Sequence, residues 1–329
     1  MYPVQKSKDW QPTGSLKNLQ FRAQFLSRIR DFFYKRGVLE VETPLMCRGA
    51  ATDPYINPIS VLYSHPNADN QNYYLQTSPE FAMKRLLAAG SGPIYQICKA
   101  FRRDETGRLH NPEFSMLEWY RPGFDHHALM DEVEALLCLI LDTEKSERIT
   151  YQAAFQKFLG FDPHAISAQQ LKQSAVSKGI ILSPSTMNTL TVDDWLDILM
   201  THCIEPHLGF DNPIMIYDFP ASKAALAKVR AVEPAVAERF EVYVRGIELA
   251  NGYHELTDPD IQLERIQADC AYRKKNGYME VPVDVFLIEA LKAGLPDSAG
   301  VALGLDRLLM LTLGSHEIQE VISFTTDRA

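Results

Sequence analysis

Residues 101–120 have the sequence FRRDETGRLHNPEFSMLEWY, and this stretch decides the fold. The segments 94–102 and 113–121 are rich in the apolar and aromatic residues that favour strands. The polar segment 103–112 between them predicts a hairpin with a long charged loop. Strands joined by local turns, without regular strand–helix alternation, predict an α+β domain in which helices flank an antiparallel sheet.

Helical patterns surround this hairpin on both sides. Apolar residues recur at helical spacing over 16–35, Gly37 ends that helix, and a short strand is expected at 38–42. Asp125 is a favourable N-cap for a helix that runs to about residue 141. The other expected elements are a loop or hairpin edge at 52–72, a helix at 79–89, short helices at about 150–210, a strand at 214–219, two strands within 239–256 with a bend at Gly252, helices at 258–275, 284–293 and 305–313, and a strand at 299–303.

The bulk composition of the 329 residues is that of an ordinary globular protein. No linker divides the chain, so we expect a tail at 1–15 and one catalytic domain at 16–329 with a helical insertion at about 150–210. A formal net charge of −9 gives no support for a nucleic-acid partner. Five widely spaced cysteines without a CxxC pair predict neither a zinc site nor disulfides. A polar N-terminus and no bilayer-length apolar run predict a cytoplasmic protein with no membrane partner.

Three short segments carry a family resemblance: GVLEVETP at 37–44, the hairpin sequence at 101–120, and GVALGLDR at 300–307. Their order and spacing resemble motifs 1, 2 and 3 of the class II aminoacyl-tRNA synthetases, with the lysyl enzymes as the closest match. GIELANG at 246–252 is correctly placed between motifs 2 and 3. The resemblance extends from about residue 16 to the end and implies the class II catalytic fold.

Adenylate formation explains why these residue types are needed. An amino-acid carboxylate attacks the α-phosphate of ATP, so two anions meet and cations must absorb the developing charge. The resemblance implies that Arg102 and Arg307 are catalytic: Arg102 grips carboxylate and phosphate, and Arg307 stacks on the adenine opposite Phe114. The full ATP-binding set expected is Arg102, Arg103, Asp104, His110, Asn111, Phe114, Glu248, Leu249, Gly304 and Arg307.

The resemblance also implies a metal site and an amino-acid pocket. Mg²⁺ is expected on Glu248 and Glu255, which we place at neighbouring strand positions. Glu118 and Tyr120 alternate on a strand, so both point to one face, where they are expected to receive the ε-ammonium of a lysine. The full substrate-binding set expected is Ser78, Pro79, Glu80, Glu118, Tyr120, Glu255 and Ala302.

The acceptor is expected to be a protein. Only about 15 residues precede the motif 1 helix, which leaves no room for the anticodon-binding OB-fold of lysyl-tRNA synthetases. The pattern resembles the freestanding synthetase paralogues that attach (R)-β-lysine to a lysine of elongation factor P after translation. It implies elongation factor P as partner, lysine or (R)-β-lysine as substrate, and no stable tRNA binding. Ser78 and Ala302 stand where lysyl enzymes usually have Ala and Gly. Two explanations stay open: selection for a β-amine over an α-amine, and neutral drift.

Two rival functions stay open on the sequence: a truncated enzyme that charges tRNA, and a non-enzymatic paralogue that acts as a regulatory binding module. Class II motif 1 helices usually form dimer interfaces, so a homodimer is expected. Elongation factor P is acidic, so a local basic surface is expected as well. The candidates for that surface are Lys84, Arg85, Arg103 and Arg108.

Overall fold

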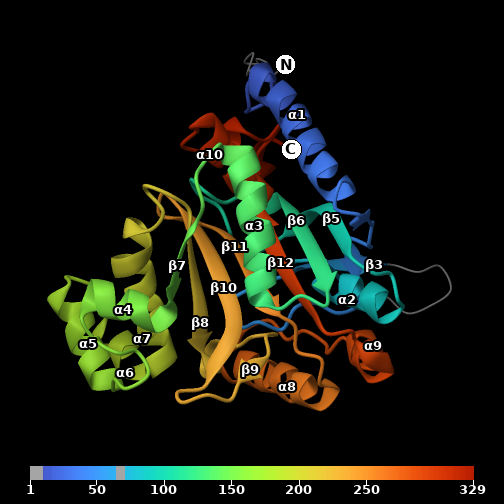
Figure 1. Ribbon diagram of the computed structural model, residues 1–329. Helices are drawn as coiled ribbons and strands as arrows, with labels where there is room; N and C mark the ends of the chain where they lie inside the picture. The colour runs from blue at the N-terminus through green and yellow to red at the C-terminus, as the bar shows by residue number, and fades with distance from the viewer. Residues whose placement is uncertain (1–9, 64–70) are drawn as a thin grey trace, which may run out of the picture. The chain divides into compact units, whose positions relative to one another are not determined.

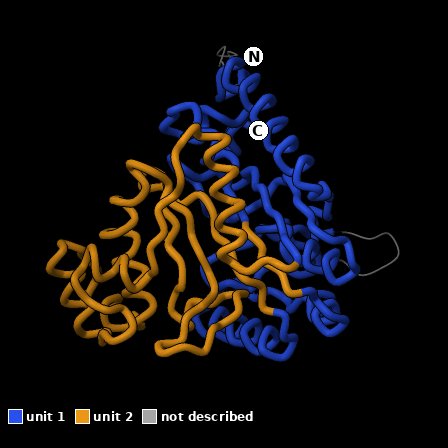
Figure 2. The backbone as a smooth tube through the Cα atoms, in the orientation of Figure 1, with its two compact units in different colours: residues 1–122, 257–296, 302–329 blue, residues 123–256, 297–301 orange. Residues whose placement is uncertain are grey.

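The computed structural model describes residues 10–63 and 71–329. Most of the expected tail at 1–15, and residues 64–70 of the expected loop at 52–72, lie outside these ranges. The described chain forms two compact units, which Figure 2 shows in different colours. Unit 1 contains the described residues up to Pro122, together with Thr257–Pro296 and Ala302–Ala329, and unit 2 contains Gly123–Leu256 and Asp297–Val301.

Unit 1 is built around the hairpin of β5 (Ile94–Phe101) and β6 (Glu113–Pro122), labelled in Figure 1. These strands are antiparallel, with Gln96 opposite Glu118, and β1 (Leu39–Glu40) pairs in parallel with β5. A second sheet has the order β2-β4-β3, with bounds Met46–Cys47, Gln71–Leu75 and Ile59–Tyr63. The helices of unit 1 are α1 (Leu16–Tyr34), α2 (Glu80–Ala88), α8 (Pro259–Lys275), α9 (Val285–Gly294), α10 (Leu305–Leu313), η4 (Ile318–Glu320) and η5 (Thr326–Arg328).

Unit 2 contains a mostly antiparallel set of strands and a helical segment. β10 (Val236–Val244) pairs antiparallel with β8 (Ile214–Pro220), β9 (Val229–Arg230) and β11 (Ile247–His254), and β7 (Glu147–Thr150) pairs in parallel with β8. β12 (Ser298–Gly304) starts in unit 2 and ends in unit 1. The helices of unit 2 are α3 (His126–Leu141), α4 (Tyr151–Leu159), α5 (Ala168–Ser177), α6 (Pro184–Thr189), α7 (Val192–Leu199), η1 (Met200–Ile204), η2 (Glu205–His207) and η3 (Ala221–Lys223).

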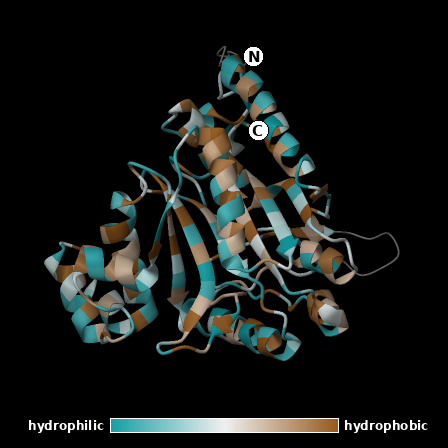
Figure 3. Ribbon diagram, in the orientation of Figure 1, coloured by the Kyte–Doolittle hydropathy of each residue, from teal (hydrophilic) through white to brown (hydrophobic). Residues whose placement is uncertain are grey.

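Local capping explains why most helices begin where the sequence predicts. Ser15, Asp125 and Thr191 each accept a backbone N–H three residues further along, at the starts of α1, α3 and α7. Asp258 and Asp284 cap α8 and α9 in the same way. Figure 3 shows a difference in hydropathy between helices, because α3 carries more hydrophobic residues than α8 does. The expected α+β class is confirmed.

Two local expectations are wrong. The strand expected at 38–42 is only the two-residue β1. The bend expected at Gly252 lies instead at Arg245 and Gly246, which both have positive φ and join β10 to β11. Gly252 lies inside β11, where an added Cβ would come within 2.4 Å of the Phe240 ring. The glycine is therefore needed for close packing on β10 and not for a turn.

None of the helices formed by the described residues is both long and apolar enough to cross a lipid bilayer.

Candidate active site

The motif 2 hairpin places Arg102 directly after β5. Its guanidinium carbon lies 5.2 Å from the centre of the Phe114 ring on β6, and Glu105 lies 3.7 Å from its Nη1. The Nε atom of Arg102 is buried and has no hydrogen-bond partner among the described residues. A buried guanidinium N–H without an acceptor is costly, so this atom is suited to an anionic ligand.

The loop after Arg102 is exposed and turns sharply. Arg103 and Asp104 are both exposed, with 3.5 Å between Arg103 Nε and Asp104 Oδ2. Asp104 has a φ of 67°, a left-handed conformation that aspartate tolerates better than most residues. The loop closes on itself between Gly107 and His110. Both side chains at 103 and 104 thus face solvent and are free of the core.

Motif 3 brings Arg307 to the motif 2 loop. Arg307 lies in the first turn of α10, just after Gly304 ends β12, and its Nη2 donates to His110 Nε2 at 2.6 Å. Burial lowers the pKa of His110, and the positive charge of Arg307 lowers it further. The imidazole is therefore neutral and can accept this bond. The predicted association of motifs 2 and 3 is seen in this pair.

A buried ion pair that the sequence reasoning missed fixes this arrangement. Asp306, only 2% exposed, accepts from Arg22 of α1 at 2.6 Å and from the backbone N–H of Ser115 at 2.7 Å. Arg22 also donates to the Ser115 hydroxyl at 2.7 Å. The acidic residue beside Arg307 at a helix start was the available signal. The network ties the neighbours of Phe114 and Arg307 to α1.

The expected amino-acid pocket is assembled in unit 1 around Glu118. This carboxylate, 2% exposed, accepts from the Ser78 hydroxyl and from the Tyr120 hydroxyl, both at 2.7 Å. Ser78 also accepts from the backbone N–H of Glu80, next to Pro79 at the start of α2. The prediction that Glu118 and Tyr120 share a face agrees with this bond. A buried carboxylate held by hydroxyl donors is a chemically suitable partner for an ammonium group.

Two buried glutamines near Glu118 and Cys98 were missed by the sequence reasoning. Gln96 is directly opposite Glu118 in the β5–β6 register, and Gln76 donates to the backbone carbonyl of Lys99. Their Oε1 atoms are buried without a hydrogen-bond partner among the described residues. Burial and the charge of Glu118 raise the pKa of Cys98, which lies beside both amides, to about 12. Unused acceptors beside a carboxylate favour a ligand with several N–H donors. We call Gln76, Ser78, Gln96, Glu118 and Tyr120 the Glu118 pocket.

Unit 2 holds a second group of carboxylates, Glu205, Glu241 and Glu248, which we call the acidic cluster. Burial raises the pKa of Glu205 to about 7, and the charges of Glu241 and Glu248 add to this shift. Glu241 accepts from Arg239 and Tyr243, both at 2.5 Å, and Tyr243 is paired with Glu248 across β10 and β11. The alternation of Arg239, Glu241 and Tyr243 was the signal in the sequence, but it was not used.

The structure does not place Glu248 and Glu255 at neighbouring strand positions. Glu248 is the second residue of β11, whereas Glu255 follows the end of that strand. Glu255 is 1% exposed, and its backbone N–H donates to the Ser298 carbonyl. The expectation that Glu248 and Glu255 share one metal ion stays a prediction.

The remaining expected residues differ in burial, from fully buried to exposed. Lys84 is 1% exposed and paired with Glu80 at 2.7 Å, so its assignment to a basic docking surface is wrong. Asn111 is buried and accepts from Thr326 near the C-terminus. The Leu249 side chain is buried inside unit 2, so a nucleotide can meet only its backbone. Exposed positions are found for Arg85, Arg103 and Arg108, and partly buried ones for Phe114, Ala302 and Gly304.

Known proteins resemble this chain over almost its full length. The family model of the tRNA synthetases class II (D, K and N) matches residues 6–328. A Vibrio cholerae protein named elongation factor P–(R)-β-lysine ligase is 52% identical over 98% of this chain and 99% of its own length. Proteins of the same name from Yersinia enterocolitica and Enterobacter sp. are 50% and 48% identical, each over 99% of this chain and 100% of their own length. The chain belongs to the class II tRNA synthetase family.

Proposed function

We propose that this protein activates (R)-β-lysine, or lysine, with ATP and transfers it to the ε-amine of a specific lysine of elongation factor P. Its family membership makes the chain an ATP-dependent ligase. The observation that supports the lysine-type substrate best is Glu118, a buried carboxylate that accepts from the hydroxyls of Ser78 and Tyr120 and lies opposite Gln96 in the β5–β6 register. The relatives' names supply the acceptor.

The first step is formation of the adenylate. A carboxylate oxygen of the amino acid attacks the α-phosphorus, the bond to the bridging oxygen breaks, and pyrophosphate leaves with that electron pair. Arg102 donates from its buried Nε and its Nη atoms to the carboxylate and α-phosphate, where negative charge builds up. Arg307 and Phe114 contact the adenine, and the bond from Arg307 to neutral His110 holds that guanidinium in place.

The Glu118 pocket selects the amino acid by charge. The ε-ammonium donates to Glu118, to the Tyr120 oxygen and to the glutamine acceptors. An uncharged side chain would leave the carboxylate buried without a counter-charge, at a cost of several kcal/mol. Ser78 and Ala302 are proposed to favour the β-amine, with Glu255 as the carboxylate that receives it. Pro79 and Glu80 position Ser78 at the start of α2.

The acidic cluster fits a hard divalent cation. Carboxylate oxygens are the ligands that Mg²⁺ prefers, and the mutual repulsion that raises the pKa of Glu205 is relieved by positive charge. Glu241 and Glu248 would hold the ion, and Glu255 is the further ligand that the family resemblance implies. When bound, Mg²⁺ supplies charge neutralisation at phosphate oxygens.

The second step is transfer to the protein acceptor. The ε-amine of the elongation factor P lysine attacks the adenylate carbonyl carbon, an amide bond forms, the amine loses a proton, and AMP leaves. Elongation factor P is acidic, so Arg85, Arg103 and Arg108 are proposed as its docking surface. This modification supports translation, and we propose a cytoplasmic location for the enzyme.

Mass spectrometry of elongation factor P, after incubation with the protein, ATP and each lysine isomer, tests the acceptor. We expect the mass of one added (R)-β-lysyl group, at a single lysine, and a slower addition of α-lysine. Efficient charging of tRNA(Lys) in a parallel reaction, with no change in elongation factor P, would replace this proposal with the tRNA-charging alternative.

Pyrophosphate exchange tests the activation step separately. We expect exchange between ATP and labelled pyrophosphate that depends on a lysine isomer and is lost in Arg307→Ala. Arg328→Ala, a change at the far end of the chain, serves as the matched control and retains exchange. A wild-type protein that shows no exchange with any lysine isomer would favour the binding-module alternative.

A homodimer is proposed through α1 and β1, whose exposed side chains include Leu16, Tyr34 and Leu39. Exposed apolar residues gathered on consecutive elements are typical of an interface. Analytical ultracentrifugation is expected to give a dimer mass for the wild type and a monomer mass for Leu39→Glu. A wild type that stays monomeric at micromolar concentration contradicts this assignment.

A further inference from the structure

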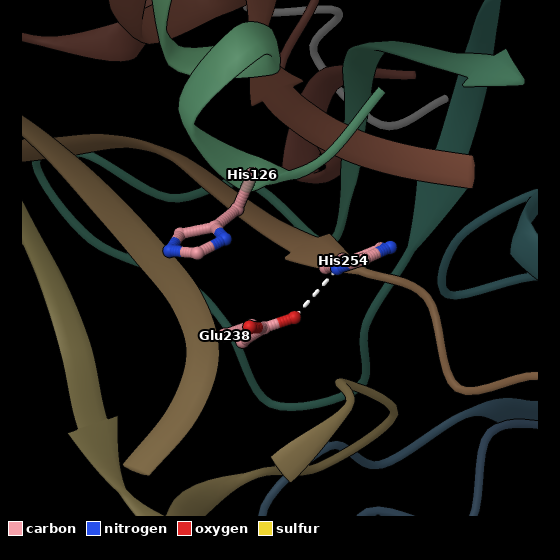
Figure 4. A group of neighbouring side chains, drawn as sticks. All are labelled: His126, Glu238 and His254. Carbon is pink, nitrogen blue, oxygen red and sulfur yellow. Dashed lines mark hydrogen bonds and ion pairs between the residues drawn. The ribbon is translucent and has the colours of Figure 1, made fainter. Parts of the chain in front are cut away.

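A second constellation of possible metal ligands lies in unit 2, apart from every residue used above. His126 comes from the first turn of α3, Glu238 from β10, and His254 from the last position of β11 (Figure 4). Their ligand atoms all lie within 4.8 Å of one another. Figure 4 shows the three side chains converging, with His254 Nδ1 2.5 Å from Glu238 Oε2.

Each histidine has a carboxylate behind one of its ring nitrogens. His254 Nε2 lies 2.9 Å from Asp297 Oδ1, and His126 Nε2 lies 3.5 Å from Asp218 Oδ1. Histidines that bind metals almost always donate their other ring N–H to a carboxylate, carbonyl or water. This arrangement leaves Nδ1 of both rings directed at the shared space beside Glu238.

His126 is the residue that most requires an explanation. It is 1% exposed, yet neither ring nitrogen makes a hydrogen bond with any of the described residues. Asp218 Oδ1 is also buried and also accepts no hydrogen bond from the described residues. His126 Nε2 and Asp218 Oδ1 face one another at 3.5 Å, whereas leaving His126 Nδ1 buried without a partner costs about 1–3 kcal/mol. An ion bound to His126 Nδ1 would fix the tautomer with a proton on Nε2, directed at Asp218.

The backbone around these residues is unusual at two facing positions. The pairing of β10 with β8 shifts register between Ala237 and Phe240, so β10 carries a bulge at Glu238 and Arg239. Opposite this bulge, Asp218 has a φ of 57°, in the left-handed region. Bulges re-aim side chains, and both bulges and left-handed residues other than glycine are enriched next to functional sites. Here they direct Glu238 and Asp218 toward the two histidines.

The local charge favours one added cation. Asp218, Glu238 and Asp297 are three carboxylates, and the cations that pair with them are Lys228, which donates to Asp297, and Arg230, which contacts both Asp218 and Glu238. While both histidines are neutral, one negative charge is left uncompensated. Binding of one divalent ion would neutralise this negative charge and leave one positive charge in excess.

We propose that His126, Glu238 and His254 form a binding site for a transition-metal ion of the Zn²⁺ type. Two imidazoles and one carboxylate form a zinc-binding set that leaves a fourth position open to water. Ligand atoms in a tetrahedral zinc site are about 3.4 Å apart, so adjustments of roughly 1 Å bring these three into place. The ion joins the start of α3 to β10 and β11.

Zinc titration of the EDTA-treated, dialysed protein tests the site. We expect one tight Zn²⁺ per chain by calorimetry and elemental analysis, a higher melting temperature with Zn²⁺, and visible absorption bands of tetrahedral Co²⁺ after cobalt substitution. If the three residues are only a hydrogen-bonded network, in which a protonated His254 bridges Glu238 and Asp297, the wild type will bind no stoichiometric Zn²⁺, and the proposal is overturned.

Variants distinguish this site from incidental binding. Glu238→Gln and His254→Gln are expected to weaken Zn²⁺ binding at least about 100-fold, and Asp297→Asn about 10- to 100-fold. His127→Ala, which removes the adjacent exposed histidine, is the matched control and binds as the wild type does. Glu248→Gln separates the site from the proposed Mg²⁺ ligands, and it should leave the Co²⁺ bands unchanged.

Equal affinities in the wild type, Glu238→Gln and His254→Gln would place any bound zinc elsewhere and overturn the proposal. Circular dichroism of each variant without metal shows whether it is folded. Because Glu238→Gln and His254→Gln replace partly exposed side chains, they keep the test valid even if a change at buried His126 prevents folding. No readout depends on ligase activity, so failure here is distinguishable from failure of the proposed function.

Discussion

The two units hold carboxylates in opposite ways. In unit 1, Glu118 accepts from the hydroxyls of Ser78 and Tyr120. In unit 2, burial raises the pKa of Glu205, and the charges of Glu241 and Glu248 raise it further. A buried carboxylate held by hydroxyls is suited to one ammonium group. Crowded carboxylates are suited to a divalent ion, since one ion relieves several repulsions at once.

The largest effect is expected from Glu118→Gln. The change keeps the shape of the pocket but removes the charge that the substrate ammonium needs, at a cost of about 3–5 kcal/mol. We expect kcat/KM for lysine-dependent pyrophosphate exchange to fall about 1000-fold. Glu113→Gln, at the exposed start of the same strand, is the control and should change little. An equal fall in kcat/KM for Glu118→Gln and Glu113→Gln would contradict the special role given to the buried carboxylate.

Asp306→Asn is expected to have the next largest effect, and on stability. Asp306 is a third type of buried carboxylate, because it is matched by the full charge of Arg22. Its neutralisation leaves that guanidinium partly buried without a counter-charge, so the free energy of unfolding should fall by about 3 kcal/mol. Urea denaturation measures this loss. An unchanged midpoint would contradict the role given to the pair, and Asp31→Asn on the exposed face of α1 is the matched control.

Much of the fold could be predicted from local sequence signals, such as helix caps and strand alternation. Helix starts were predicted correctly where a side chain caps the helix, as Asp125 does for α3. Glu118 and Tyr120 were predicted as neighbours because residues two apart on a strand share a face. The pairing of Arg22 with Asp306, however, joins residues 284 positions apart and has no local signature. The same holds for His126 and His254, because the packing of helix α3 against strands β10 and β11 brings them together.

The expected neighbouring strand positions of Glu248 and Glu255 are wrong for a different physical reason. The two residues are seven positions apart, and a strand rises by about 3.3 Å per residue, so they lie at different points along it. Glu241, which is nearer to Glu248 in space, lies on the adjacent strand β10. A resemblance to a family identifies which residues matter, whereas which of them act together depends on register.

Glu205 is expected to make the free energy of unfolding depend on pH. Its folded pKa, about 7, is above the usual 4.5, so the folded state holds the proton more tightly than the unfolded state does. The stability from this group is complete below about pH 4.5 and is lost as the pH rises through about 7, by about 2 kcal/mol. Urea unfolding between about pH 5 and 8 should show this decline.

Glu205→Gln should flatten that decline, and Mg²⁺ should reduce it in the wild type by neutralising Glu241 and Glu248. Glu144→Gln, a change at an exposed glutamate, is the control and should leave the decline unchanged. A slope that is the same in Glu205→Gln as in the wild type would mean that the acidic cluster does not interact as described.

Ser78→Ala is expected to have the smallest effect. It removes one of the two hydroxyls that donate to Glu118, and a hydrogen bond to a charged group contributes about 1.5 kcal/mol. We expect KM for (R)-β-lysine to rise about 10-fold, with a smaller rise for α-lysine. Ser60→Ala, at an exposed position on β3, is the matched control. Equal rises for both isomers would remove Ser78 from any role in choosing between them.

The three-way bond of Arg22, Asp306 and Ser115 has an evolutionary consequence. Motifs 1, 2 and 3 are separate in the chain, yet the Asp306 carboxylate is bonded to a side chain from α1 and a backbone amide from β6. Loss of Asp306 leaves the charge of Arg22 without its partner, and loss of Arg22 leaves the charge of Asp306 without its partner. Substitutions at positions 22 and 306 should therefore be inherited together, and lineages that carry only one of the two should be rare.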